Sequence, residues 1–373
     1  MPYQVNPDRN IPWNGLPELP IDKTLYETVE VYAQLGNAKA ALGRLQGRSI
    51  AIPNQGLLIN SISLQEAKAS SAIENIFTTD DELYKAFSEQ RIEQLHGASK
   101  EVLKYREALW KGYDYLKRND TFDEAYFISI YREIKELNDG IRLPSSGIYI
   151  KQGGSGSNAG KAFYTPPRGP GIVEAKLANL IEFVNDDKQF PVDPLLKMGI
   201  GHLQFEAIHP FTDGNGRAGR IFNIHYLTQK GLLDYPILFL SKYIMDHKDD
   251  YYSGLAGVTQ RGDWKTWLIY ILKAIEATAN LTYDKINDII NAKDSILQAV
   301  VADSNIARPE SLVNALFTQP YTKVKHLTTS GIYAENTARK YLDELAKMRI
   351  LEKRSMEGNN YYLNLELYRI LGE

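Results

Sequence analysis

Apolar residues recur at helical spacing along most of the chain. The segments "LYETVEVYAQLGNAKAALGRL", from about Lys23 to near Gly47, and "SISLQEAKASSAIENIF", from 61 to about 77, carry apolar positions three and four residues apart. This period predicts amphipathic helices. Two or three more helices are expected between Asp80 and Asn138. Residues 1–22 are rich in proline and asparagine, which favours an extended arm.

The pattern changes between residues 139 and 171. Two short β-prone stretches, "GIYI" and "AFYT", lie there among many glycines and prolines. Short strands bounded by turn residues are typical of a hairpin. We therefore expect a β-hairpin, or flap, that projects from a helical body.

Two further helices flank the stretch "HPFTDGNGRAGR", residues 209–220. The first, "DPLLKMGIGHLQFEAI", begins with Asp193 as N-cap and Pro194 at the first helical position. It should end near His209, because Pro210 disfavours helical geometry in the residue before it. The next helix, "RAGRIFNIHYLTQKG", is expected to close at Gly231. The stretch is thus a loop that leads into a helix N-terminus.

This loop has the composition of an anion site. Gly214 and Gly216 allow backbone amides to turn inward, and the helix dipole adds roughly half a positive charge at the same place. Arg217 and Arg220 are three residues apart and share one face of the helix. A phosphate is therefore the expected ligand.

Two side chains beside the loop add chemistry to this anion site. The carboxylate of Asp213 would repel a phosphate unless a divalent cation lay between them, and Mg²⁺ suits one carboxylate with phosphate oxygens and waters. His209 lies where the helix breaks and could accept a proton from an incoming hydroxyl. Taken singly, such loops, arginine pairs and histidines are more often structural. Their order and spacing together favour a functional site.

Composition limits the classes of function that are possible but does not itself indicate a function. The chain has 373 residues and a formal charge of −3, which gives no overall attraction to nucleic acid or membrane. It has no cysteine, which excludes disulfides and thiolate zinc sites and fits a reducing compartment. No signal sequence or long apolar run is evident, so a cytoplasmic protein without membrane contact is expected.

The stretch 209–220 resembles the motif HPFx(D/N)GNGRxxR of the Fic family at every defined position. The resemblance implies a mainly α fold, a helical bundle with a β-hairpin flap, and transfer of AMP from ATP to a Ser, Thr or Tyr hydroxyl of a target protein. It implies these roles: His209 as general base, Asp213 as Mg²⁺ ligand, Gly214, Asn215 and Gly216 as phosphate-binding residues, Arg217 and Arg220 as β- and γ-phosphate ligands, and Phe211 as the anchor of the loop in the core.

A second signal is "SSAIEN", residues 70–75. Ser70 and Glu74 are four apart on one helical face, and an anion near a helix C-terminus requires a cation. The stretch resembles the inhibitory helix (S/T)xxxE(G/N) of some Fic proteins, whose glutamate pairs with the second motif arginine. The resemblance implies that Glu74 pairs with Arg220, keeps the γ-phosphate away and leaves ATP in a non-productive pose. The alternative is an exposed glutamate that meets only solvent.

Residues 249–272 resemble the helix pair that follows the Fic motif, where Tyr251 would contact the nucleotide. Trp264 and Trp267 are expected in the core. A metal site of His202 and His225 with His209 is disfavoured, because these histidines are expected on separate helical faces. The flap is expected to dock a target segment by strand pairing, with an ordinary surface hairpin as the alternative.

The last segment, 307–373, predicts three helices and then a strand pair that turns at "EGNN". That order resembles a winged helix. Ten basic and eight acidic residues in this segment give weak support for DNA binding, and winged helices also serve as protein-contact modules. DNA therefore remains a weakly supported partner of residues 307–373.

These observations divide the chain into an arm with N-terminal helices (1–110, inhibitory helix about 61–77), a Fic core (111–290, flap 139–171, motif 209–220) and a winged-helix-like module (300–373). The first hypothesis is a self-inhibited protein adenylyltransferase that uses ATP and Mg²⁺ on another protein or on itself. A homodimer would be one way to hold the inhibitory helix shut. The second hypothesis is a DNA-binding regulator that only senses nucleotide, and the reverse reaction, removal of AMP, stays open because a glutamate could position water.

Overall fold

The computed structural model describes residues 3–6, 8–50, 55–89, 96–151, 162–356 and 359–372. Its helices are η1 (Lys23–Leu25), α1 (Val29–Ile50), α2 (Gln55–Ile73), α3 (Asp80–Glu89), α4 (Ala98–Asn119), α5 (Glu124–Lys135), α6 (Ile172–Asn185), α7 (Pro194–Ile208), α8 (Asn215–Gln229), α9 (Leu240–Asp246), α10 (Lys248–Arg261), α11 (Trp264–Asp303), α12 (Pro309–Leu316), α13 (Val324–Thr329), α14 (Glu335–Lys347) and α15 (Leu365–Gly372). Its strands are β1 (Ile150–Lys151), β2 (Ala162–Tyr164), β3 (Tyr321–Thr322), β4 (Leu351–Met356) and β5 (Asn359–Asn364).

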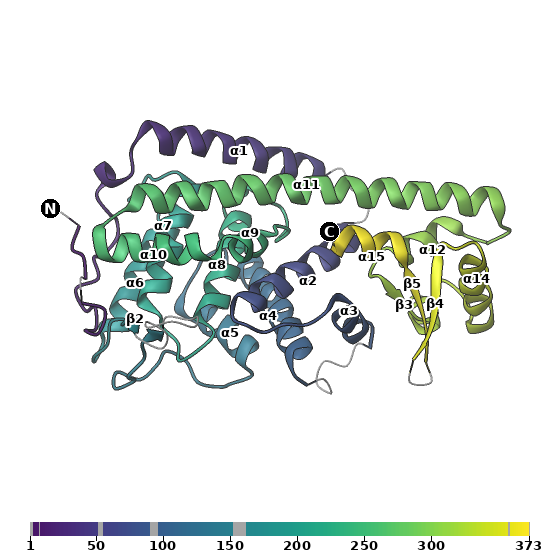
Figure 1. The fold of residues 1–373 in the computed structure, drawn as a ribbon, viewed down its shortest axis with the longest axis horizontal. Helices are drawn as coiled ribbons and strands as arrows, with labels where there is room; N and C mark the ends of the chain where they lie inside the picture. Colours follow the sequence, from purple (N-terminus) through teal and green to yellow (C-terminus); the bar gives the residue numbers. More distant parts are fainter. Residues whose placement is uncertain are drawn as a thin grey trace.

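The predicted mainly α fold is confirmed. The 40-residue helix α11 lies along α1 and continues past it toward the C-terminal elements (Figure 1). It passes without interruption through residues 290–300, between the expected core and the C-terminal module. Trp264 and Trp267, at its start, are fully buried, as predicted. None of the described helices is long and apolar enough to cross a membrane.

Helices α7 and α8 lie in the middle of the bundle, between α4, α5 and α6 on one side and α10 and α11 on the other (Figure 1). Aromatic rings fill the space where they meet α5. Phe127 stacks on Phe205 at 5.1 Å between ring centroids, and Phe222 contacts Phe122 at 5.3 Å. Burial of such rings is among the largest apolar contributions to a core. The loop that joins α7 to α8 is therefore fixed at both ends to a rigid body.

Two helices near the N-terminus have boundaries that differ from those predicted. The first long helix begins at Val29, after the short helix η1, and continues through Gly47 to Ile50. Gly47 does not end it, because its backbone stays outside the left-handed region that terminates helices. The second helix begins at Gln55 and ends at Ile73, earlier than predicted at both ends. Asn75, with φ of 62°, is left-handed and ends that helix.

The N-terminal arm is extended, as predicted, and it packs against the body. Trp13 and Leu16 are buried. The backbone amide of Trp13 donates to the carbonyl of Thr165 at 3.1 Å, and Lys176 on α6 donates to the carbonyl of Leu16 at 2.6 Å. The arm therefore braces the base of the predicted flap.

The predicted hairpin is confirmed as an antiparallel pair of β1 and β2, in which Ile150 faces Tyr164. The part of the flap between residues 152 and 161 lies outside the described residues. Tyr164 is buried, and its hydroxyl donates to the carbonyl of Ala207 on α7 at 2.8 Å. This bond ties the flap to the helix that carries His209.

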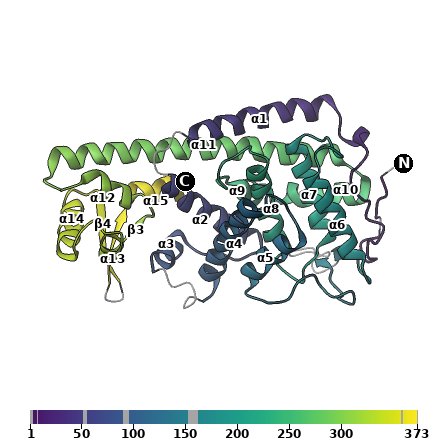
Figure 2. The ribbon, with the colours of Figure 1, turned by 180° about the vertical axis from the view of Figure 1, so that it is seen from behind.

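The C-terminal region contains the predicted three helices, α12, α13 and α14, followed by the strand pair β4 and β5. The short strand β3 completes a sheet of order β3-β5-β4, and α15 returns toward α2 and α11 (Figure 2). Arg354 on β4 makes an ion pair with Asp81 on α3 at 2.8 Å. The C-terminal region therefore lies against the segment that follows α2.

Candidate active site

The loop 209–214 is held by its own side chains. His209 caps α7 with φ of 52°, and its amide donates to the carbonyl of Phe205 at 2.9 Å. Phe211 is fully buried and stacks on Tyr131 at 4.4 Å. The amide side chain of Asn215 exchanges two hydrogen bonds with the backbone of Phe211, at 2.8 and 2.9 Å. Asn215 therefore braces the loop with its side chain.

Helix α8 begins at Asn215, two residues earlier than predicted, with Gly214 as N-cap at φ of 74°. Glycine adopts this left-handed conformation without strain. At Gly216 the space is already taken: a Cβ there would lie 2.4 Å from Oε1 of Glu74 and 2.9 Å from Nη1 of Arg220. The carboxylate of Glu74 thus lies against the helix N-terminus where a phosphate was predicted.

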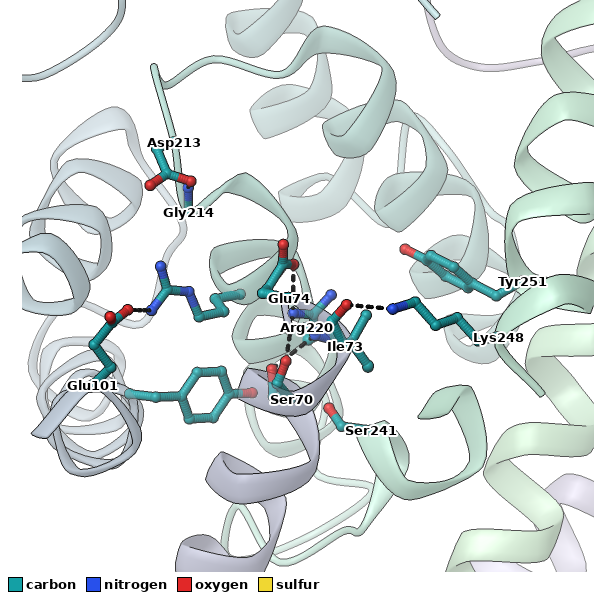
Figure 3. Close-up of polar contacts among 12 residues, drawn as sticks. Ser70, Ile73, Glu74, Glu101, Asp213, Gly214, Arg220, Ser241, Lys248 and Tyr251 are labelled. Carbon is teal, nitrogen blue, oxygen red and sulfur yellow. Dashed lines mark hydrogen bonds and ion pairs between the residues drawn. The ribbon is translucent and has the colours of Figure 1, made fainter. Parts of the chain in front are cut away.

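Glu74 pairs with Arg220, as the resemblance implied, and Ser70 also bonds this arginine (Figure 3). Arg220 donates to Oε1 of Glu74 at 2.9 Å, to Oγ of Ser70 at 2.7 Å and to the carbonyl of Ser70 at 3.0 Å. Arg220 and Ser70 are buried. Burial raises the pKa of Glu74, but Arg220 and then Arg217 outweigh it and hold this pKa below its ordinary value. Both members of the pair are charged.

The end of α2 is fixed by cations as well as by Glu74. Besides Arg220, Lys248 at the start of α10 donates to the carbonyl of Ile73 at 2.7 Å (Figure 3). Cations that bond the last carbonyls of a helix also complement its dipole. The helix end would therefore keep two of its anchors if the Glu74 side chain were removed.

The other charged residues of the motif also have protein partners. Arg217 is buried and makes an ion pair with Glu101, in the first turn of α4, at 3.0 Å (Figure 3). Asp213 pairs with Lys135, the last residue of α5, at 2.6 Å. Burial raises the pKa of Asp213, but Lys135 and the amide of Gly214 outweigh it and lower this pKa overall. Asp213 is thus ionised and could bind a cation if Lys135 moved aside.

His209 is enclosed by the helix end and by Arg142. Arg142, which follows α5, donates to the carbonyls of His209 at 2.8 Å and Ile208 at 3.3 Å, and its amide donates to the carbonyl of Pro210 at 2.9 Å. Burial and, second, the charge of Arg142 lower the pKa of His209 to about 4. Nδ1 of His209 is buried without a partner among the described residues. His209 is therefore neutral near pH 7.

His209 lines a pocket that is partly open to solvent. Arg220, Gly216 and Glu74 line the same pocket. The rest of the wall is mostly apolar and aromatic, and comes from α7, α10 and the flap: Leu203, Tyr252, Leu255, Ile150 and Phe163. The pocket thus combines a few charged groups with a mostly apolar wall, a composition typical of small-molecule sites.

Tyr251 lines this pocket, but it is 2% exposed and its hydroxyl lies 2.9 Å from Nε2 of His202. The partners of His225 are the hydroxyl of Tyr126 and the carbonyl of Leu109, each at 2.7 Å. Both histidines are engaged within the core. In the described part of the chain, no group of three or more His, Asp or Glu side chains is placed to hold a metal.

Sequence reasoning missed four residues at this site: Glu101, Lys135, Arg142 and Glu206. The first three lie 116, 78 and 67 residues from their partners, so no spacing rule could reveal them. Glu206 is three residues before His209 on α7, a helical spacing that places both on one face. It lines the pocket beside His209.

Three family models match parts of this chain. The family model "Fic/DOC family N-terminal" matches residues 32–114, "Fic/DOC family" matches 121–227, and "Protein adenylyltransferase SoFic-like, C-terminal domain" matches 297–367. Curated relatives include the protein adenylyltransferase fic-1 of Caenorhabditis elegans, 28% identical over 40% of this chain and 27% of that protein. A probable protein adenylyltransferase of Aquifex aeolicus is 29% identical over 50% of this chain and 54% of that protein. The chain thus aligns with about half or less of the length of these relatives.

Two solved structures have a similar fold. A Fic family protein from Desulfovibrio desulfuricans superposes with a TM-score of 0.57 at 18% identity, over 93% of this chain and 98% of that one. Fic-1 from C. elegans gives a TM-score of 0.52 at 18% identity, over 68% of this chain and 72% of that one. At this identity the likeness concerns the fold. With the motif loop, the pocket and the three matching models, it shows that the chain belongs to the Fic/DOC family.

Proposed function

We propose that this protein transfers AMP from ATP to a hydroxyl group of a target protein. The observation that carries the proposal is the single pocket that joins His209, the N-terminus of α8 and Arg220 to an apolar wall. The relatives named as protein adenylyltransferases support the same reaction. Adenosine would occupy the apolar end, and the phosphates would lie along the amides of Gly214 to Gly216.

The proposed reaction is an in-line displacement at the α-phosphorus. The hydroxyl oxygen of the target forms a bond to this phosphorus, the bond to the oxygen that bridges the α- and β-phosphates breaks, and pyrophosphate leaves. His209 accepts the hydroxyl proton, because it is neutral and stands at the phosphate end of the pocket. Arg217, Arg220 and the α8 amides would stabilise the negative charge of pyrophosphate.

The donor set near the loop suits Mg²⁺. Asp213 offers an ionised carboxylate with a side chain that is 64% exposed, and Mg²⁺ commonly takes one or two carboxylates, with phosphate oxygens and waters as the remaining ligands. Asp213 would hold the ion after release from Lys135. The ion would neutralise charge on the departing phosphates.

We also propose that Glu74 inhibits the enzyme. Its carboxylate occupies both the guanidinium of Arg220 and the space beside Gly216, so a γ-phosphate cannot bind there at the same time. ATP would then bind without the contact that orients its α-phosphorus toward the attacking hydroxyl. Ser70 contributes by holding Arg220 in the orientation that meets Glu74.

Glu101 is expected to act as a weaker second inhibitor. Glu101→Gln should raise AMP transfer about two- to fivefold, because its ion pair with Arg217 is 44% exposed at the glutamate and such pairs contribute about 0–1 kcal/mol. The measurement is initial transfer rate at subsaturating ATP, with Glu124→Gln, an exposed glutamate on α5, as control. An unchanged rate would show that phosphates displace Glu101 without cost.

The pH dependence follows from the low pKa of His209. A histidine whose pKa is lowered keeps its base form in acid, so kcat at saturating ATP should stay flat from neutral pH down to about pH 5 and fall only as His209 gains a proton near pH 4. The profile is best recorded with the Glu74→Gly variant, where transfer is not limited by inhibition. A fall with its midpoint at pH 6.5 would contradict a buried, desolvated His209.

ATP labelled once at the α-phosphate and once at the γ-phosphate tests the reaction itself. Protein that gains label from the α position alone supports AMP transfer, whereas label from the γ position would make the protein a kinase. Loss of bound label on longer incubation would favour the reverse reaction, removal of AMP. No transfer by any variant would favour the nucleotide-sensing regulator.

Several basic side chains of residues 307–373 are engaged in ion pairs with acidic side chains, namely Lys323 with Glu89, Arg339 with Glu335, Lys353 with Asp343, Arg354 with Asp81 and Arg369 with Glu366. Paired cations contribute less to the binding of DNA phosphates. This pairing favours a protein-contact role for the region over DNA binding.

A further inference from the structure

One carboxyl group that lines the pocket has no role in the mechanism above. Glu206 lies on α7, three residues before His209, and lines the same pocket. Its Oε1 is buried and has no hydrogen-bond partner among the described residues. An unsatisfied buried acceptor costs free energy, so in native proteins it calls for an explanation.

Glu66, a buried glutamate, shows what a purely structural carboxyl looks like in this protein. Burial raises the pKa of both Glu66 and Glu206 to about 7. Glu66, however, accepts hydrogen bonds from the amide of Ser241 at 2.9 Å and from the hydroxyl of Tyr105 at 3.2 Å. Glu66 joins three helices, whereas Glu206 lines a pocket and its buried Oε1 has no hydrogen-bond partner among the described residues.

The order of residues along α7 indicates which part of a bound nucleotide would lie next to Glu206. Leu203, Glu206 and His209 follow one another at intervals of three residues, which is about 4.5 Å along a helix axis. His209 marks the place of the α-phosphate, and Leu203 with Leu255 and Phe163 belongs to the apolar wall suited to a base. In a nucleotide the ribose lies between phosphate and base, so it would pass Glu206.

We propose that Glu206 binds a ribose hydroxyl of the nucleotide and selects ribonucleotides over deoxyribonucleotides. The inference rests on the proposed function for the phosphate end of the pocket. A hydroxyl group donates a hydrogen bond, and a carboxyl oxygen without a partner accepts one, so binding would satisfy both groups at once. Gly219 on α8 makes room for this arrangement, since a Cβ there would lie 2.6 Å from Oε1 of Glu206.

Binding of ATP, 2′-deoxy-ATP and 3′-deoxy-ATP to the Glu74→Gly variant, measured by calorimetry, tests this inference. At least one of the deoxynucleotides should bind about tenfold more weakly than ATP, because a site built around a hydroxyl rejects the analogue that lacks it. Adding Glu206→Ala should weaken ATP binding and abolish that preference. Glu206→Gln, which keeps one acceptor and the same shape, should preserve part of it, and Glu124→Gln should preserve all of it.

Equal affinity for ATP and both deoxynucleotides before any change at Glu206 would overturn the inference. A preference for ATP over the deoxynucleotides that survives Glu206→Ala would also overturn it. So would a Glu206→Ala protein that loses discrimination against GTP and keeps discrimination against the deoxynucleotides, because Glu206 would then contact the purine base. Because binding is measured apart from catalysis, discrimination without AMP transfer would refute the proposed reaction and still support the ribose contact. Melting curves of both Glu206 variants would show that the comparison is made on folded protein.

Discussion

Glu74→Gly is expected to raise the rate of AMP transfer from ATP by about 10- to 100-fold. Glu74 and Arg220 form a charge-assisted hydrogen bond at 2.9 Å, and such bonds contribute about 1.5–3 kcal/mol. In the proposed inhibition, ATP breaks this bond before its γ-phosphate reaches Arg220, so removal of the bond should lower the barrier by a similar amount. The measurement is transfer of α-labelled phosphate to protein at fixed ATP and Mg²⁺.

Two further variants separate inhibition from a general effect on folding. Glu74→Gln keeps a neutral hydrogen bond to Arg220 and should give an intermediate rate, while Glu124→Gln should leave the rate unchanged. The free energy of unfolding of the Glu74→Gly protein should fall only moderately, because the end of α2 keeps its bonds from Arg220 to Ser70 and from Lys248 to Ile73. A Glu74→Gly protein that is folded, binds ATP and transfers AMP at the rate of the unchanged chain would refute the inhibitory role.

His209→Ala should abolish most transfer, with a loss of about 10²- to 10⁴-fold in kcat, which is the usual contribution of a general base. The loss should also appear in the Glu74→Gly background, since the two residues act on different steps. Among the described residues that line the pocket His209 is the one histidine, and burial favours its neutral form, so no other described histidine can replace it there. ATP binding should persist, because Arg220 and the α8 amides remain.

His247→Ala provides the matched control for this histidine. His247 is exposed and lies between α9 and α10; its side chain bonds the carbonyl of Tyr243, and its ring stacks on that tyrosine at 4.0 Å between centroids. Its removal should leave the transfer rate near that of the unchanged chain. AMP transfer by the His209→Ala protein at more than about a tenth of the normal rate would contradict the assignment of His209 as general base.

Helix boundaries near the site were predictable where they depend on neighbouring residues. Asp193 caps α7, Pro194 begins it and His209 ends it before Pro210, as the sequence indicated. The prediction placed the start of α8 too late, because Asn215 looks like a loop residue. The bonds from its side chain to the backbone of Phe211 close the loop while its own backbone is already helical.

The sequence by itself determined the loop, its glycines, the helix dipole and the pairing of Glu74 with Arg220, although the last came from resemblance to a known pattern. Only the tertiary structure placed Glu101 on Arg217, Lys135 on Asp213, Arg142 on the carbonyl of His209 and Glu206 in the pocket. The physical reason is the distance in sequence over which each kind of contact acts. Caps and turns depend on residues a few positions apart, whereas these contacts form only when helices distant in the chain pack together and bring their charges into reach.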